Sequence, residues 1–224
     1  MENKQEHDRE GVSLPKIKHF IETALYGKTR NADAYLEKFA DLNIEALRAM
    51  TNKKLRYVLL DIDACIAPSY GPILEENLQK IRELISQGVK IGVYSNCKGM
   101  ERLNPIREMG IPIYDGELAK PLAEGFEGVC EKFGFNPKET LMVGDNPVTD
   151  GGAVGVLEGM VFVKPIPNDK NVKLRFSKKC SLFAQKMLRS LTLFRTLIGN
   201  RKILKSENLA NWNDPLNIIP AAAE

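Results

Sequence analysis

Apolar residues along the middle of the chain follow two alternating patterns. Short, mostly apolar runs, typical of buried β-strands, occur at 57–60, 89–94, 111–114, 140–143 and 160–163. Between and after these runs lie segments expected to be helical, at 74–85, 100–109, 121–133 and 149–157. Strands that alternate with helices in this way predict an α/β fold, namely a three-layer, doubly wound parallel sheet with helices on both faces.

The two ends of the chain predict helices in place of further β-α units. In the first fifty residues, apolar positions recur at helical spacing: Ile17, Phe20, Ile21, Ala24, Leu25, Tyr35, Phe39, Leu42 and 44–47. A second helical stripe runs through 178–198, at Phe183, Met187, Leu191, Phe194 and Ile198. We therefore expect an N-terminal helical extension over 1–54, a central α/β domain over 55–166 and a C-terminal helical extension over 167–224.

The C-terminal extension is strongly basic although the whole chain is nearly balanced. The net charge is +3, yet 170–205 hold eleven Lys or Arg residues and no Asp or Glu. A basic amphipathic helix either packs on its own core or lies on an anionic membrane surface, and the sequence leaves both open. No aromatic platform accompanies the basic residues, so nucleic acid is not an expected partner. The oligomeric state is left open.

The composition is that of an ordinary globular protein, with 43% hydrophobic and 27% charged residues. No apolar run is long enough to cross a bilayer. The first ten residues contain acids and no hydrophobic segment, unlike a signal or transit peptide. We therefore expect a cytoplasmic protein, with peripheral contact with a membrane as an option.

Several classes of catalytic site are excluded by residue spacing. The four cysteines form no C-x-x-C pair and none has an arginine six positions later, which argues against zinc and against a cysteine-based phosphatase. Both histidines, His7 and His19, precede the first expected strand, so the central domain has no imidazole for a Ser-His or Cys-His nucleophile. Catalysis there would depend on carboxylates, lysine or a metal ion.

Acidic residues follow two of the expected strands at the point where each strand ends. Asp61 and Asp63 come after 57–60, and Asp145 and Asp150 come after 140–143. The carboxyl ends of parallel strands form the ligand crevice of an open sheet, so these acids can meet although they are far apart in sequence. Clustered carboxylates repel one another unless a cation joins them, and Mg²⁺ prefers oxygen ligands. The pattern predicts a magnesium site and phosphate chemistry.

Two further residues at strand or helix ends suit a phosphate group. Ser95 follows the strand 89–94, and Lys120 stands just before Pro121 at the start of a helix. A hydroxyl with adjacent amides can hold phosphate oxygens, and a lysine can neutralise them as a point charge. A carboxylate can serve as the phosphoryl acceptor.

The ordered set Asp-x-Asp, Ser, Lys-Pro and Gly-Asp-x-x-x-x-Asp resembles the haloacid dehalogenase (HAD) superfamily of aspartate-dependent phosphatases, over roughly residues 55–165. The resemblance implies an HAD Rossmann-like fold, Mg²⁺ and an aspartyl-phosphate intermediate. It implies these roles: Asp61 as nucleophile and Mg²⁺ ligand, Asp63 as general acid/base and backbone-carbonyl ligand, Ser95, Asn96 and Lys120 as phosphate-binding residues, and Asp145 as Mg²⁺ ligand. For Asp150 it leaves two roles open, support of the metal or orientation of the lysine.

The spacing between motifs indicates the subclass. Only 31 residues separate Asp63 from Ser95 and 24 separate Ser95 from Lys120, which leaves no room for an inserted cap domain. An uncapped, open site favours a large substrate such as a lipid head group or a protein. One departure stands in the first motif, where Cys65 replaces the usual Thr or Val, and this puts catalytic efficiency in question.

Within the superfamily, the chain is similar to the YqeG-like group of subfamily IIIA, which includes phosphatidylglycerophosphate phosphatases. The likeness lies in Asp61–Asp63, Tyr94–Asn96, Ala119–Pro121, Val143–Asp145 with Thr149–Asp150, and 161–166. It implies a phosphomonoesterase for a lipid phosphate such as phosphatidylglycerophosphate. Two alternatives stay open: a phosphatase of a soluble metabolite such as phosphoglycolate, and an inactive HAD-like adaptor that docks on a membrane or a partner.

Overall fold

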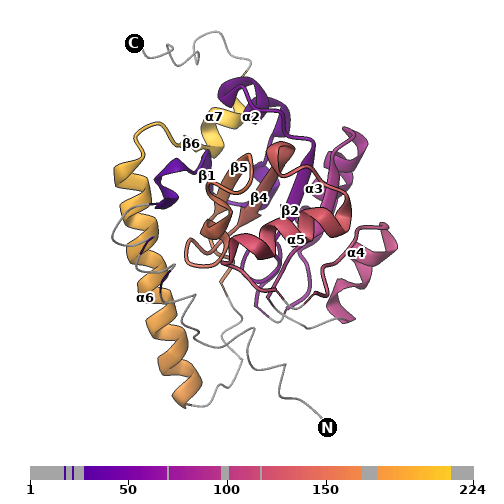
Figure 1. The fold of residues 1–224 in the computed structure, drawn as a ribbon. Helices are drawn as coiled ribbons and strands as arrows, with labels where there is room; N and C mark the ends of the chain where they lie inside the picture. Colours follow the sequence, from indigo (N-terminus) through magenta and orange to yellow (C-terminus); the bar gives the residue numbers. More distant parts are fainter. Residues whose placement is uncertain are drawn as a thin grey trace.

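The computed structural model describes residues 28–69, 71–96, 101–116, 118–167 and 176–212, together with Lys18 and Glu22; of residues 28 and 176–185 only the backbone is described. Its centre is one six-stranded parallel sheet in the order β3-β2-β4-β5-β1-β6 (Figure 1). The strands are β1 Ala34–Leu36, β2 Tyr57–Leu60, β3 Lys90–Val93, β4 Thr140–Gly144, β5 Gly159–Val163 and β6 Leu204–Lys205. The α/β prediction is therefore confirmed.

Helices cover both faces of the sheet. They are α2 Ile44–Thr51, α3 Glu75–Ser86, α4 Asn104–Glu108, α5 Ala123–Phe133, α6 Phe176–Gly199 and α7 Ser206–Ala210, with short 3₁₀ helices η1 Lys28–Asn31, η2 Phe39–Asp41, η3 Glu101–Leu103, η4 Pro137–Glu139 and η5 Asp150–Ala153. Two apolar cores result: helices α2, α3, α4 and α7 contribute to one, and helix α5 to the other. Successive residues of a strand point to opposite faces, so Val58 joins the first core and Leu59 the second.

Glycines follow the two helices that flank the central strands. Gly88 follows α3 with φ 78°, and Gly134 is the C-cap of α5 with φ 66°. A left-handed backbone conformation is accessible to glycine at little cost. Each helix therefore turns directly into the next strand or into the short connection that precedes it.

Some expected elements are wrong. Residues 34–36 form strand β1 and no helix, and 204–205 form strand β6, so both terminal extensions contribute strands to the sheet. Strands of three and two residues are too short to show a period, and their pairing with β5 and with each other decides their conformation. The expected helix 149–157 is only the 3₁₀ helix η5, because glycines interrupt it, and the expected strand 111–114 is a single bridge between Ile113 and Val93.

Two further expected helices are present in the structure, and one expected helical stripe lies outside the described residues. The expected helix 100–109 appears as η3 followed by α4, and the expected helix 178–198 lies within α6. The helical stripe Ile17, Phe20, Ile21, Ala24 and Leu25 lies outside the described residues. The division into segments 1–54, 55–166 and 167–224 stays a prediction.

The order of the strands determines where a ligand crevice forms. Strand β2 pairs with β3 on one side and with β4 on the other, so the chain crosses over β2 between β3 and β4. This change of direction is the switch point at which open α/β sheets bind ligands, next to the carboxyl ends of the strands. Among the described residues, the connections after β2 and β3 hold only helices of the sheet's own layers and no cap domain.

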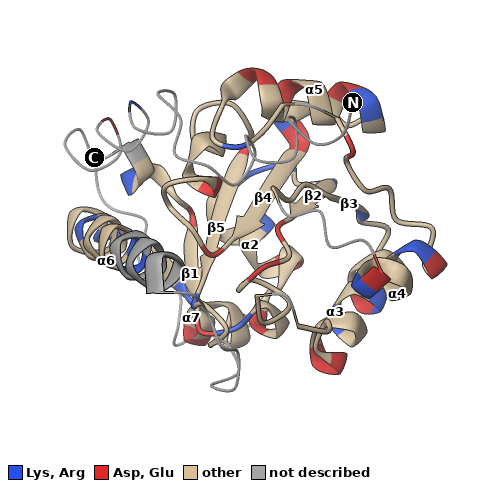
Figure 2. Cartoon of the chain, turned by 90° about the horizontal axis from the view of Figure 1, so that it is seen from below, with Lys and Arg blue, Asp and Glu red and all other residues tan. Residues whose placement is uncertain are grey.

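Helix α6 lies apart from these layers, alongside the end of the sheet that contains β1 and β6 (Figures 1 and 2). Its 24 residues make it the longest helix in the described part of the chain. Within that same part, no helix combines the length and the apolar character required to span a membrane.

Candidate functional site

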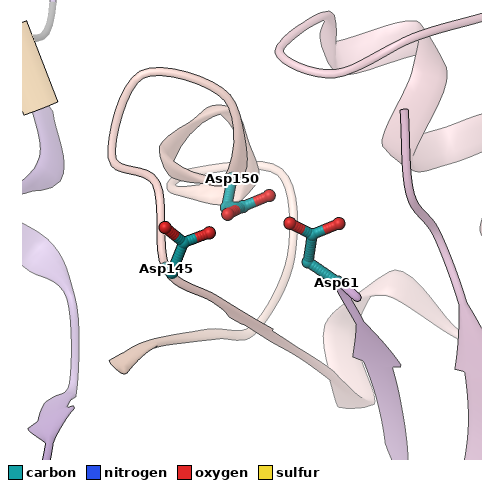
Figure 3. A group of neighbouring side chains, drawn as sticks. All are labelled: Asp61, Asp145 and Asp150. Carbon is teal, nitrogen blue, oxygen red and sulfur yellow. The ribbon is translucent and has the colours of Figure 1, made fainter. Parts of the chain in front are cut away.

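Three carboxylates converge at the switch point (Figure 3). Asp61 follows β2, Asp145 follows β4, and Asp150 begins η5. One carboxylate oxygen from each lies within 4.8 Å of the others, and all three side chains are buried. Two strands and one short helix therefore bring together acids that are up to 89 positions apart in sequence.

Lys120 lies among these acids. Its Nζ is 2.8 Å from Asp61 Oδ1 and 2.5 Å from Asp150 Oδ1, and the side chain is buried. Burial disfavours the charged amine, but the carboxylates of Asp150 and Asp61 outweigh it and raise the pKa of Lys120 above its ordinary value. The lysine is therefore a fixed positive charge beside two carboxylates, and it orients Asp150.

Asn96 holds the backbone at Lys120. Its side-chain Oδ1 accepts a hydrogen bond from the Lys120 N–H at 3.1 Å, and its Nδ2 donates to the Lys120 carbonyl at 3.2 Å. The Lys120 Nζ also lies 5.7 Å from the centre of the Tyr94 ring. Both ends of the Asn96 amide thus position the lysine, and its expected contact with phosphate stays a prediction.

Asp150 accepts a hydrogen bond from the loop that follows β4. The Asn146 N–H donates to Asp150 Oδ2 at 2.9 Å. Burial, opposed by Lys120 and reinforced by Asp61, raises the pKa of Asp150 to about 6. Burial and the nearby Asp150 likewise raise the pKa of Asp145, against the effect of Arg189. Burial is the main reason why both carboxyl groups are harder to ionise than usual.

Asp63 lies at the partly exposed rim of the site and pairs with an arginine. Arg102 Nη2 is 2.8 Å from both carboxylate oxygens of Asp63, and Nη1 of the same guanidinium is 3.3 Å from the Gly71 carbonyl. Arg102 belongs to η3, the short helix that follows strand β3 in the chain. The sequence interpretation did not identify it, because no motif position marks an arginine that reaches the site from a remote turn.

A second arginine reaches the site from the C-terminal helix. Arg189 of α6 places Nη1 2.6 Å from Asp145 Oδ2. In the sequence, the only indication of this arginine is the basic character of 170–205. That charge was expected to face a membrane or to accompany packing, and no contact with Asp145 was predicted.

The remaining motif residues lie at the same edge. Ser95 follows β3 and is buried. Cys65 is buried under Asp61, with its Sγ 3.8 Å from the Val143 carbonyl, which also accepts the Asp61 N–H at 3.0 Å. Burial, and then the charge of Asp61, raise the pKa of the Cys65 thiol well above its ordinary value. The thiol is therefore a neutral packing group.

The cluster suits a small divalent cation. Oxygen donors on three buried acids match the preference of Mg²⁺, and the two basic groups in contact with the cluster leave it one negative charge in excess. Asp61 and Asp145 would hold the ion, with Asp150 close to it. The predicted metal role of the Asp63 backbone carbonyl stays a prediction.

Comparisons with known proteins bear on this site. The family model described as haloacid dehalogenase-like hydrolase matches residues 4–154, more than half of the chain. No curated protein matches the sequence.

Among solved structures, the chain is similar to a putative HAD subfamily III A hydrolase from Legionella pneumophila, with 14% identity, a TM-score of 0.43, and coverage of 67% of this chain and 93% of that one. It is also similar to 3-deoxy-D-manno-octulosonate 8-phosphate phosphatase from Yersinia pestis, with 12% identity, a TM-score of 0.43 and coverage of 70% and 87%. A third similar structure is a cobalt-bound deoxy-D-mannose-octulosonate 8-phosphate phosphatase from Haemophilus influenzae. It has 18% identity and a TM-score of 0.41, and the match covers 48% of this chain and 67% of that one.

Proposed function

Because the chain belongs to the haloacid dehalogenase-like hydrolases, we propose that it is a Mg²⁺-dependent phosphomonoesterase that acts through an aspartyl-phosphate on Asp61. The observation that carries this proposal is the contact of Lys120 with Asp61 and Asp150 inside a cluster of three buried carboxylates. A purely structural role would not require this concentration of buried charge, since unpaired buried charges are costly.

The proposed reaction has two steps on residues of this chain. In the first, an Asp61 oxygen attacks the phosphorus atom, the bond to the ester oxygen breaks, and Asp63 gives that oxygen a proton. In the second, Asp63 takes a proton from a water molecule that attacks the phosphorus, the bond to Asp61 breaks, and inorganic phosphate leaves. Both acids end in the state in which they began.

The other groups of the site stabilise charge during these steps. A bound Mg²⁺ would neutralise the negative charge of the phosphate and of Asp61, which otherwise repel each other. Lys120 supplies a second, fixed positive charge, and Ser95 with its neighbouring amides is the proposed holder of the phosphate oxygens. Arg102 fixes the place of the Asp63 carboxylate at the rim.

The test is the hydrolysis of a generic aryl phosphate in the presence of Mg²⁺. We expect Asp61→Asn to abolish turnover while the circular dichroism spectrum is unchanged, and EDTA to abolish turnover of the wild type. Asp115→Asn, a change of the same kind at an acid with 69% exposure, serves as the matched control and should keep full activity. Full turnover by Asp61→Asn would refute the nucleophile assignment.

For the substrate we propose a lipid phosphate such as phosphatidylglycerophosphate, as the likeness to the YqeG-like group implies. Two features of the described residues support it: the site carries no cap, and helix α6, which reaches the site with Arg189, exposes a row of large apolar side chains on its outer face. Met187, Leu191, Phe194 and Ile198 are 51–63% exposed. They follow one another at intervals of four, three and four residues, which places them on one face of the helix.

This apolar face supports peripheral contact with an anionic membrane. Lys186 and Arg195 are also exposed on the helix, and each base near an anionic surface contributes about 1 kcal/mol to binding. Such a helix lies in the interface with its apolar face toward the acyl chains. Contact of α6 with the membrane would hold the protein at the surface that contains the lipid phosphate.

Point variants test the membrane contact better than truncation, because 170–224 include strand β6 and the buried Leu209 of α7. We expect Leu191→Ser with Phe194→Ser to lose binding to vesicles that contain phosphatidylglycerol, and to lose turnover of phosphatidylglycerophosphate but not of an aryl phosphate. Ile85→Ser, at an exposed apolar residue of α3, is the control. Equal vesicle binding by the double variant would refute the contact, and preference for phosphoglycolate would favour the soluble substrate.

A further inference from the structure

Helix α6 sends one arginine into the candidate site. The guanidinium of Arg189 is 2.6 Å from Asp145 Oδ2, and the Asp145 side chain is only 4% exposed, whereas that of Arg189 is 23% exposed. Arg189 stands 35 positions beyond the last residue matched by the family model. It is therefore an addition to the site from outside the matched region.

The helix is fixed in the position that this contact requires. Thr192 and Thr196 lie three and seven residues after Arg189, so all three residues share one face of the helix, and both threonines are buried. The Thr196 hydroxyl shares a hydrogen bond with the Thr29 hydroxyl, and Asn200 Nδ2 donates to the Ala32 carbonyl at 2.8 Å. The inward face of α6 is thus attached to η1 and to the start of β1.

The basic partners of the cluster are divided between its acids. Lys120 pairs with Asp61 and Asp150, and Arg189 pairs with Asp145. A divalent cation held by Asp61 and Asp145 would require the carboxylate oxygens of Asp145, one of which Arg189 occupies. Cation and guanidinium are therefore competitors for the same group.

The charge count shows what the arginine adds once a cation is bound. Three carboxylates, Lys120 and a divalent cation sum to zero, and Arg189 brings the sum to +1. A guanidinium is always charged and its planar fork matches the oxygens of phosphate. Its side chain is partly exposed, so an anion from solvent can reach it.

We propose that Arg189 is a substrate-binding residue supplied by the C-terminal helix: it pairs with Asp145 in the ion-free protein and with a phosphate oxygen when a divalent cation holds that carboxylate. This inference rests on the proposed function, since it assigns a phosphate ester to the site. The proposal can be distinguished from a purely structural role for Arg189. Under the proposal, removal of the arginine strengthens cation binding and weakens phosphate binding.

The test measures binding by calorimetry on the full chain, with no turnover involved. For Arg189→Gln we expect Mg²⁺ to bind several-fold more tightly than in the wild type, since its competitor is gone. Inorganic phosphate, titrated in saturating Mg²⁺, should bind about tenfold more weakly, the cost of one hydrogen bond to a charged group. Arg201→Gln, at an exposed arginine just after the same helix, should change neither constant.

Two results of the Arg189→Gln titrations would contradict the proposed role of Arg189. Weaker Mg²⁺ binding in Arg189→Gln would show that the arginine only supports Asp145, and unchanged phosphate binding would exclude a role toward the anion; either result overturns the proposal. If Arg189→Gln does not fold, Arg189→Lys carries the test, with an expected loss of phosphate affinity of a few-fold. Absence of turnover of any phosphate ester by the wild type would refute the proposed function and leave these binding constants to be judged by themselves.

Discussion

The carboxylate of Asp150 lies directly over the α-carbon of Gly144, at the end of the central strand β4. A Cβ atom added at Gly144 would stand 2.2 Å from Asp150 Oδ2 and 2.3 Å from its carboxyl carbon. No side chain heavier than hydrogen fits there while Asp150 keeps its place. Gly144, which directly precedes Asp145, is therefore required by Asp150, six residues later.

This relationship predicts the effect of Gly144→Ala. We expect the methyl group to displace Asp150 from Lys120, so that Mg²⁺ binds at least about tenfold more weakly and phosphatase activity falls with it. The measurements are Mg²⁺ calorimetry and aryl phosphate turnover.

Gly128→Ala is the matched control for that change. A Cβ at Gly128 would meet only Leu118 Cδ1 at 3.7 Å and the Tyr114 hydroxyl at 3.9 Å, which are ordinary contacts. Because Gly128 lies inside helix α5, alanine should raise stability by up to about 1 kcal/mol without changing Mg²⁺ binding. Wild-type Mg²⁺ affinity in Gly144→Ala would show that the loop adapts and would contradict the prediction.

Lys120→Met tests the buried charge at the centre of the site. The change leaves Asp61 and Asp150 buried without their cation, which costs on the order of 3–5 kcal/mol for a buried pair. We expect the metal-free variant to unfold at lower urea concentration than the wild type, with part of the loss restored by Mg²⁺, and to have no measurable turnover.

The control for that variant is Lys132→Met. Lys132 pairs with Asp115, but both side chains are about half exposed or more, and exposed ion pairs contribute little. A loss of stability in Lys132→Met as large as that in Lys120→Met would mean that burial of the lysine is not the cause.

The sequence predicts the centre of the site because one rule connects its residues. Asp61 and Asp145 follow apolar strands, and the carboxyl ends of parallel strands meet at one edge, so their proximity requires no knowledge of side-chain positions. Lys120 and Asp150 follow from the motif order. The structure adds that Asp150 contacts Lys120 and also has a carboxylate oxygen within 4.8 Å of those of Asp61 and Asp145.

The two arginines and the two short strands could not be predicted in the same way. Arg102 and Arg189 reach the acids with long side chains from elements whose position depends on the packing of the whole fold. Strands β1 and β6 contain three and two residues, so their pairing with neighbouring strands, and not a local pattern, gives them their conformation. In both cases the sequence alone is insufficient, because the position of the arginines and the conformation of the short strands depend on tertiary contacts.

Mg²⁺ binding should weaken as the pH falls through about 6. The pKa of Asp150 is raised to about 6 and that of Asp145 is also raised, so below this pH a proton competes with the cation for the cluster. We expect the affinity near pH 5 to be about tenfold lower than near pH 7.5, since one pH unit below its pKa a carboxyl group is mostly neutral. Calorimetry in two buffers with different ionisation enthalpies should also show proton release near pH 6.

Asp150→Asn separates this effect from a general loss of structure at low pH. With the titrating group removed, the pH dependence of Mg²⁺ affinity should become shallower, while Asp115→Asn should reproduce the wild-type curve. Equal wild-type affinities at the two pH values would contradict the assignment of the raised pKa to the site.

Cys65 stands where the family motif usually has Thr or Val, and the structure indicates that its thiol takes no part in the chemistry. The group is fully buried, its pKa is raised well above the ordinary value, and its contact with the Val143 carbonyl is long. We expect Cys65→Val to keep turnover within about threefold of the wild type, because a swap of similar volume in a core is tolerated best. Cys130→Val, in the core on the other face of the sheet, provides the comparison: a loss of stability shared by both variants would reflect packing alone. A tenfold loss of turnover in Cys65→Val with a normal melting temperature would contradict this prediction.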